Sequence, residues 1–157
     1  MENKNIHVLA RALIVDQDHV LLCQTLDLSV PFYFLPGGHI EHGESAETAL
    51  LRELREETGA QCKIKRFLGC LEYSFEPGHS SICHNHEYNF VFEAQSDELK
   101  LKNPLLPIED HIRLLWMPIY KITDIDFRAE PLKDLIPKWL QCNFDHNFIS
   151  SMNRVIA

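Results

Sequence analysis

The stretch GGHIEHGESAETALLRELREETGA, residues 37 to 60, decides the fold. It joins a double glycine to a segment in which apolar residues recur at the spacing of one helix face: Ala46, Ala49, Leu50 and Leu54. Ser45 suits the N-cap of this helix and Gly59 suits the residue after its last turn. We therefore expect a helix over residues 45–58, directly behind a glycine-rich loop.

The same helix carries three carboxylates, Glu53, Glu56 and Glu57, within an arc of about 100°. We expect this arc to point away from the apolar stripe. If it faces a cleft, two carboxylates ~5 Å apart repel by roughly 3 kcal/mol at an effective dielectric of 20. A hard divalent cation would convert that penalty into binding energy. The alternative is a solvated acidic surface, but the preceding glycines, which let the backbone approach a ligand closely, favour a site.

The spacing of these residues resembles a known motif. Gly38, five residues, Glu44, seven residues and the run Arg52-Glu53-Leu54-Arg55-Glu56-Glu57-Thr58-Gly59-Ala60 resemble the Nudix box, GX5EX7REUXEEXGU. Every polar and glycine position of the motif agrees over residues 38–60. Ala60 stands where a larger aliphatic residue is preferred, which affects packing and not chemistry.

The resemblance implies a Nudix fold within an α/β class: an α/β/α sandwich with a mixed β-sheet and a loop–helix–loop catalytic motif. It implies Mg²⁺- or Mn²⁺-dependent hydrolysis of a nucleoside diphosphate derivative. By position in the motif, Glu53, Glu56 and Glu57 hold metal, and one of them activates the attacking water. Arg52 orients these carboxylates, and Glu44 braces the loop or assists the metal.

Several residues outside the helix are further candidates for the site. A backbone carbonyl of Gly37 or Gly38 would contact metal or substrate, and His39 (like His42) would meet phosphate. Glu87 and Asn89 share a strand face and would contact substrate if that face lines the cleft.

A later loop supplies one more acidic candidate. Enzymes similar to the motif often draw an additional acid from such a loop, and Glu109, with Asp110 beside it, is the candidate metal ligand or base. An exposed loop acid is the alternative. Phe32, Tyr33 and Phe34 could stack on a nucleobase or pack as strand aromatics.

The substrate is left open by the motif. ADP-ribose or a nucleotide sugar is our first expectation, since Pro77 lies close to where ADP-ribose-cleaving members carry a proline. A nucleoside triphosphate house-cleaning pyrophosphatase is the alternative. A non-catalytic, nucleotide-sensing module of the same fold is the alternative of another class, although such a module is expected to lack box carboxylates or the arginine.

The remaining pattern predicts an α/β layered domain. Strands are expected in the apolar or alternating runs 7–15, 20–24, 63–72, 88–94 and 114–117, with residues 16–19 turning the first hairpin. A second helix is expected over residues 131–141, kinked or broken at Pro137. No repeat or low-complexity linker divides the 157 residues, so we expect a single domain over residues 1–157.

Composition restricts the partners. A net charge of −8 disfavours stable nucleic-acid binding. A protein this acidic would need a bound metal cation to bind a phosphate compound. We expect a small-molecule nucleotide as the partner, no membrane, and a cytoplasmic protein without a signal peptide; a homodimer is one option for its oligomeric state. Five cysteines without a CxxC pair favour reduced thiols. A zinc site from His79, Cys83, His84 and His86 is disfavoured because their spacing matches no standard ligand pair.

Overall fold

A computed structural model describes residues 5–75, 85–106, 108–141 and 145–152. Nine strands, two α-helices and one 3-10 helix make up the described part. In chain order they are β1 (Ile6–Asp16), β2 (His19–Thr25), β3 (Tyr33–Phe34), β4 (Gly37–His39), α1 (Ala46–Thr58), β5 (Lys63–Ser74), β6 (His86–Gln95), β7 (Ile112–Pro118), η1 (Ile119–Asp124), β8 (Phe127–Arg128), α2 (Leu132–Leu140) and β9 (Phe148–Ser150).

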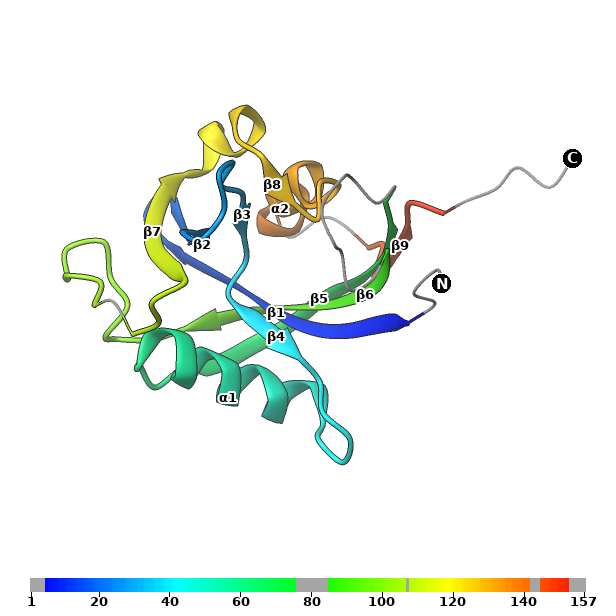
Figure 1. Ribbon diagram of the computed structural model, residues 1–157, viewed down its shortest axis with the longest axis horizontal. Helices are drawn as coiled ribbons and strands as arrows, with labels where there is room; N and C mark the ends of the chain where they lie inside the picture. Colours follow the sequence, from blue (N-terminus) through cyan, green and yellow to red (C-terminus); the bar gives the residue numbers. More distant parts are fainter. Residues whose placement is uncertain (1–4, 76–84, 107, 142–144, 153–157) are drawn as a thin grey trace, which may run out of the picture.

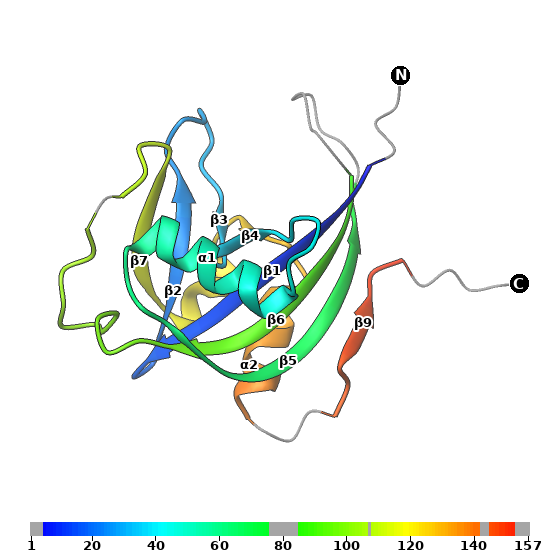
Figure 2. The ribbon, with the colours of Figure 1, turned by 90° about the horizontal axis from the view of Figure 1, so that it is seen from below.

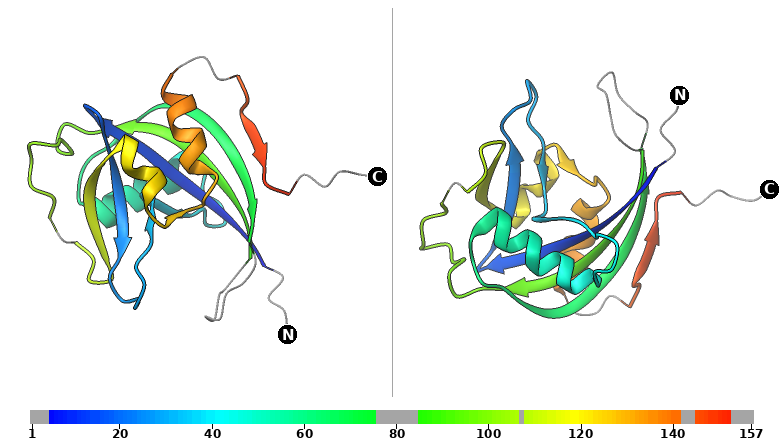
Figure 3. Two further views of the ribbon diagram at one scale, coloured as in Figure 1. Left: turned by 90° about the horizontal axis from the view of Figure 1, so that it is seen from above. Right: turned by 60° about the horizontal axis from the view of Figure 1, so that its bottom comes forward.

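The strands form a mixed, strongly curved sheet with a helix on either side (Figure 1). Seen from below, α1 lies in front of the sheet and α2 behind it (Figure 2), and from above the order is reversed (Figure 3). The strand order is β8-β3-β2-β1-β6-β5-β9, with β4 added to β1 and β7 added to β2. The expected α/β/α arrangement with a mixed sheet is confirmed.

The long strand β1 is the centre of the sheet. It pairs parallel with β6 from Ile6↔His86 to Ile14↔Ala94, and antiparallel with β4 and β2. The hairpin to β2 closes on Asp16↔His19, and Gln17 in its turn adopts a φ of 54°. Residues 16–19 therefore turn the first hairpin as expected.

Helix α1 has both of the predicted caps. The Ser45 hydroxyl accepts a hydrogen bond from the Thr48 N–H at 3.1 Å, which satisfies one of the unpaired donors of the first turn. At the other end Gly59 adopts a φ of 70° and its N–H donates to the Arg55 carbonyl, which a residue with a side chain would do only under strain. The helix therefore begins and ends where its sequence predicts.

The curved sheet divides the core in two. Ala10, Ala12 and Ile14 of β1 pack with Leu50 and Leu54 on the α1 side. The α2 side is built from a second group of buried residues that includes Leu13, Leu71, Val91, Phe127, Leu132, Ile136 and Trp139. Alternation along β1 thus supplies both cores, and the middle of the strand pairs with the loop strand β4.

Of the kink or break expected at Pro137, the break is wrong. Helix α2 continues through this residue to Leu140. Three buried residues, Leu135, Ile136 and Trp139, pack on both sides of the proline. Tertiary packing therefore holds the helical course across a residue that lacks the backbone N–H.

Two further expectations are that the protein does not associate with a membrane and that its cysteines are reduced thiols. No helix in the described residues is long and apolar enough to cross a membrane. Cys23, Cys62 and Cys70 are free thiols. Cys83 and Cys142 lie outside the described residues.

Candidate active site

Gly37 is the point at which the helix, the loop and the central strand meet. Its N–H donates to Glu57 Oε2 at 2.8 Å, and its carbonyl accepts from the Arg11 guanidinium at 2.7 Å. Gly37 has a φ of 126°, and a Cβ there would lie 2.1 Å from the Ala10 carbonyl oxygen. Only glycine fits this position, because both the backbone angle and the contact with β1 exclude a side chain.

Glu57 is buried beneath this loop. It is 7% exposed, and desolvation raises the pKa of its carboxyl from 4.5 to about 8. The Gly37 N–H and the Arg11 charge lower this pKa, while the charges of Glu53 and Glu109 raise it further. A buried carboxyl that neighbouring acids discourage from ionising is suited to a bound cation, which would favour its charged form.

The expectation that all three box carboxylates point away from the apolar stripe is wrong for Glu57. Glu57 follows Leu50 by seven residues, two helical turns, and therefore shares its face. Leu50 and Leu54 are fully buried on that face. Glu56, in contrast, has a side chain that is 52% exposed. The acidic arc therefore runs from solvent into the interior.

Arg52 connects the loop to the helix. Its guanidinium donates to both oxygens of Glu44, at 2.8 and 3.0 Å, and to the His39 carbonyl at 3.1 Å. It also donates to Glu53 Oε1 at 3.0 Å and reaches Glu56 Oε2 at 3.4 Å. The hydrogen bond with Arg52 holds the pKa of Glu44 below its ordinary value. Arg52 thereby fixes two box carboxylates relative to the loop.

Gly38 leaves room for one of these carboxylates. A Cβ at Gly38 would lie 2.5 Å from Glu53 Cδ. Glu53 can therefore lie against the loop backbone only because residue 38 has no side chain. The carbonyl oxygens of the loop and the oxygens of the three carboxylates are hard donors, the kind of ligand that Mg²⁺ prefers.

The charge of Glu109 raises the pKa of the Glu57 carboxyl, and the neighbouring Ile108 lies 3.4 Å from the position that a Cβ at Gly59 would occupy, at the end of α1. Both acids also raise the pKa of the buried Cys23 thiol, after the larger effect of burial itself. Glu109 Oε2 lies 3.2 Å from His111 Nε2. Glu109 and Asp110 both line one cavity beside this loop.

Glu87 and Asn89 lie on the sheet face opposite α1. Both are buried, and Asn89 Nδ2 donates to Glu87 Oε1 at 2.9 Å. On this face Asn89 is level with Leu9, and Val91 is level with Arg11, which binds the Gly37 carbonyl. The pair is therefore not adjacent to Glu53 and Glu56, and it is connected to the box through β1 and Gly37.

Arg11 is a site residue that the sequence did not single out. Besides Gly37, its guanidinium donates to the Leu35 carbonyl at 3.2 Å and lies over the Phe34 ring, 5.4 Å from the centroid. The available signal was a single arginine in an otherwise apolar strand. The guanidinium of Arg128 lies over the Phe32 ring in a similar way, 4.1 Å from the ring centroid.

The histidine candidates are dispersed. His39 Nε2 lies 2.8 Å from His7 Nδ1 across β4 and β1, and His42 is exposed in the turn before α1. Of the zinc candidates, His79, Cys83 and His84 lie outside the described residues, as does Pro77. His86 Nε2 lies 3.6 Å from Glu72 Oε1. Within the described ranges no three acidic, histidine or cysteine side chains already surround one metal position.

The donors nevertheless fit a divalent cation. Glu57 uses Oε2 for the Gly37 bond and Glu53 uses Oε1 for Arg52, so each carboxylate has its other oxygen to offer. The charge of Glu109 acts on the same buried carboxyl. Carboxylate and carbonyl oxygens suit Mg²⁺ and Mn²⁺ and not soft metals.

Comparison with known proteins gives a consistent result. The model of the NUDIX domain matches residues 5–139. A Bacillus subtilis protein described as a proposed 8-oxo-dGTP diphosphatase is 38% identical over 76 residues, 47% of either chain. An ADP-ribose pyrophosphatase of Methanocaldococcus jannaschii is 40% identical over 68 residues, 43% of this chain and 38% of that protein. The chain thus spans less than half of the length of these curated relatives.

Solved structures agree on the fold. A NUDIX hydrolase from Nitrosomonas europaea superposes with a TM-score of 0.69 at 22% identity, over 88% of this chain and 90% of that one. This likeness concerns the fold alone.

Proposed function

The chain belongs to the Nudix family, and we propose that it is a metal-dependent pyrophosphohydrolase that cleaves the diphosphate linkage of a nucleoside diphosphate derivative such as ADP-ribose or a nucleotide sugar. The observation that carries the proposal is the junction at Gly37. There a buried Glu57, the loop backbone and Arg11 meet beside carboxylates that Arg52 orients. The ADP-ribose pyrophosphatase among the relatives supports the substrate class.

In the proposed site Glu53, Glu56 and Glu57 hold the metal, with Glu109 as a further ligand. Mg²⁺ or Mn²⁺ would offset the charge of the diphosphate and lower the pKa of a bound water. Arg52 keeps the two carboxylates that it contacts in one orientation, and Glu44 fixes Arg52 in turn. One of the box carboxylates accepts the proton of the attacking water.

The nucleoside end is proposed to extend across the sheet face that carries Arg11, Asn89 and Glu87. Its polar atoms are the amide of Asn89 and the carboxylate of Glu87, which are already hydrogen-bonded to each other. Paired buried groups of this kind discriminate strongly among ligands, because a mismatched ligand leaves them unsatisfied. Arg11 connects this face to the loop through the Gly37 carbonyl.

Hydrolysis of a nucleoside triphosphate is the second candidate. It is favoured by the Bacillus subtilis relative described as a proposed 8-oxo-dGTP diphosphatase. We also propose that residues 1–157 form one domain and that the protein is cytoplasmic, a location supported by the three free thiols.

A substrate panel with Mg²⁺ or Mn²⁺ tests the proposal. ADP-ribose, nucleotide sugars and nucleoside triphosphates are incubated with the protein, and the phosphorus products are separated. Nucleoside monophosphate with a phosphorylated second moiety identifies a diphosphate substrate, whereas pyrophosphate identifies a triphosphate. Tight nucleotide binding with no turnover of any compound would instead support a sensing module.

A further inference from the structure

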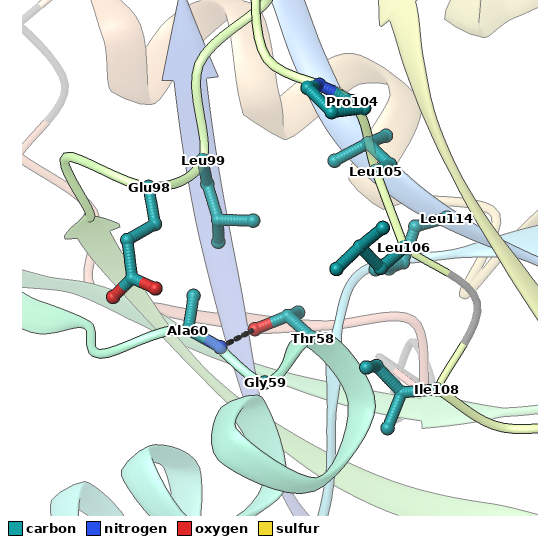
Figure 4. Close-up of a pocket in the computed structure, with 10 residues that line it drawn as sticks. All are labelled: Thr58, Gly59, Ala60, Glu98, Leu99, Pro104, Leu105, Leu106, Ile108 and Leu114. Carbon is teal, nitrogen blue, oxygen red and sulfur yellow. Dashed lines mark hydrogen bonds between the residues drawn. The ribbon is translucent and has the colours of Figure 1, made fainter.

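Two adjoining cavities lie under the segment between β6 and β7. Three leucines, Leu105, Leu106 and Leu114, line both of them. The smaller cavity, of about 280 Å³, extends to Thr58 and Gly59 at the end of α1 (Figure 4). The larger, of about 420 Å³, is also lined by Leu26 and Glu109.

The larger cavity lies near the end of α1: Glu109 lines it, and the preceding residue, Ile108, lines the smaller cavity together with Thr58 and Gly59, which directly follow Glu57. The charge of Glu109 also raises the pKa of the Glu57 carboxyl. Asp110 and Arg113 are the other charged residues in its lining. Arg113 donates to the Gln24 Oε1, and Gln24 Nε2 donates to the Tyr33 hydroxyl at 3.1 Å, so its guanidinium is already engaged.

The rest of the lining is aliphatic. It consists of Leu26, Leu105, Leu106, Ile112 and Leu114. Two of these residues, Leu26 and Leu106, are 50% and 63% exposed although they face a concave surface. Exposed apolar side chains gathered at the edge of a concavity mark a binding surface. The volume of about 420 Å³ lies in the range of ligand pockets.

We propose that this cavity binds an apolar group attached to the far phosphate of the substrate, the side of the diphosphate opposite the nucleoside. The inference rests on the proposed cleavage of a diphosphate linkage, and it ranks nucleoside diphosphate derivatives with an apolar second group ahead of ADP-ribose and nucleotide sugars as substrates. A sugar could donate a hydroxyl hydrogen bond to the exposed Asp110, but its other hydroxyls would lose water against five aliphatic side chains that return no hydrogen bond. An alkyl chain or the face of a second nucleobase would lose nothing of this kind and would bury apolar surface.

Selectivity between matched diphosphates tests the inference. The compounds are ADP-ribose, diadenosine diphosphate and the ADP ester of hexanol, which share the ADP half. Leu26→Gln and Leu106→Gln are combined in one variant, and Leu28→Gln is the control, since Leu28 is 48% exposed but lines neither cavity. Thermal melts that match wild type establish that both variants fold.

Wild type is expected to have a higher kcat/KM for the hexyl or adenosine compound than for ADP-ribose. The double variant is expected to lower this ratio about tenfold. The change should appear mainly as a higher KM for the apolar compound, because the lost contacts are made equally in the ground state and the transition state. Leu28→Gln should leave the ratio at its wild-type value. The better of the two apolar compounds identifies the group as aliphatic or aromatic.

Two results would overturn the inference in different ways. Cleavage of ADP-ribose with a selectivity ratio that the double variant does not change overturns the apolar subsite alone. The same holds for a wild-type preference for ADP-ribose. Failure to cleave any diphosphate with either metal overturns the proposed function and this inference together.

Discussion

Glu57 Oε2 accepts the Gly37 N–H at 2.8 Å, which ties the last turn of α1 to the loop that enters β4. The contact joins a residue of the helix to one twenty positions earlier, and both groups are buried. It makes Glu57 a structural residue of the metal-free protein as well as a proposed metal ligand. The two roles can be separated by substitution.

Glu57→Gln should lower turnover by orders of magnitude without lowering the melting temperature of the metal-free protein below that of wild type. Glutamine keeps an oxygen that accepts the Gly37 N–H, and it mimics the neutral carboxyl that a pKa of about 8 favours near neutral pH. The variant loses only the charge that would hold the metal. Steady-state kinetics with Mg²⁺ and a thermal melt check this, and full metal-dependent activity in the variant would contradict it.

The stability of the metal-free protein should fall as the pH rises from about 4.5 to about 8. The pKa of Glu57 is raised in the folded state relative to its ordinary value of 4.5. Its contribution to the free energy of unfolding is therefore fully present below about pH 4.5 and is lost as the pH passes through about 8. Denaturant titrations in EDTA across this range measure it.

Glu57→Gln is the reference for that experiment, because other shifted groups then cancel in the difference between the two proteins. The pKa values of Glu44, Glu72 and Glu93 are lowered, so these groups act in the opposite direction at more acid pH. Saturating Mg²⁺ should restore most of the stability of wild type near pH 8 and little of it near pH 5. Equal pH slopes for wild type and variant would show that Glu57 is not the group.

Arg52→Lys should lower kcat by about ten- to a hundredfold, the usual cost of losing a residue that orients metal ligands. Lysine keeps the charge, but one ammonium cannot replace the guanidinium bonds to Glu44, Glu53 and the His39 carbonyl. Arg55→Lys on the same helix is the matched control. Similar kinetics for the two variants would deny Arg52 a positioning role.

Gly38→Ala should impair activity more than stability. The new Cβ would meet the carboxylate of Glu53 at about 2.5 Å, and a side-chain end can move aside at little cost while losing its orientation. Gly37→Ala should do the reverse and destabilise the fold, since its Cβ would meet the backbone of Ala10. Activity and denaturation curves for the two variants give this contrast, and a Gly38→Ala enzyme as active as wild type would refute it.

Leu54→Ala should destabilise the protein by roughly 2–5 kcal/mol, as a fully buried leucine in a packed core does. Leu51→Ala, three residues earlier and 39% exposed, should cost much less. Urea titration of both variants measures the difference. Equal costs would mean that the two faces of α1 are assigned incorrectly.

Helix α1 could be predicted because its local signals agree. The apolar spacing, the Ser45 cap and the Gly59 terminus all act within one element, and the structure contains each of them. The buried direction of Glu57 was missed because the carboxylates were considered only relative to one another. Its distance of two helical turns from Leu50 contained the information.

The remaining features depend on contacts between distant segments. Arg11 becomes a site residue only because β4 pairs beside it, and β4 is too short to show a periodicity of its own. The same is true of β8 and β9, which pair with β3 and β5. Pro137 was judged by its local preference, which packing against the sheet overrides.

The parallel pairing of β1 with β6 has a consequence for synthesis of the chain. The central strand leaves the ribosome well before its parallel neighbour β6, which begins at His86. Until then the run from Leu9 to Ile14 has β2, β4 and α1 beside it but lacks its longest strand partner. Such long-range pairing folds slowly and leaves apolar segments exposed in the nascent chain. Truncations that end before β6 should therefore aggregate during translation.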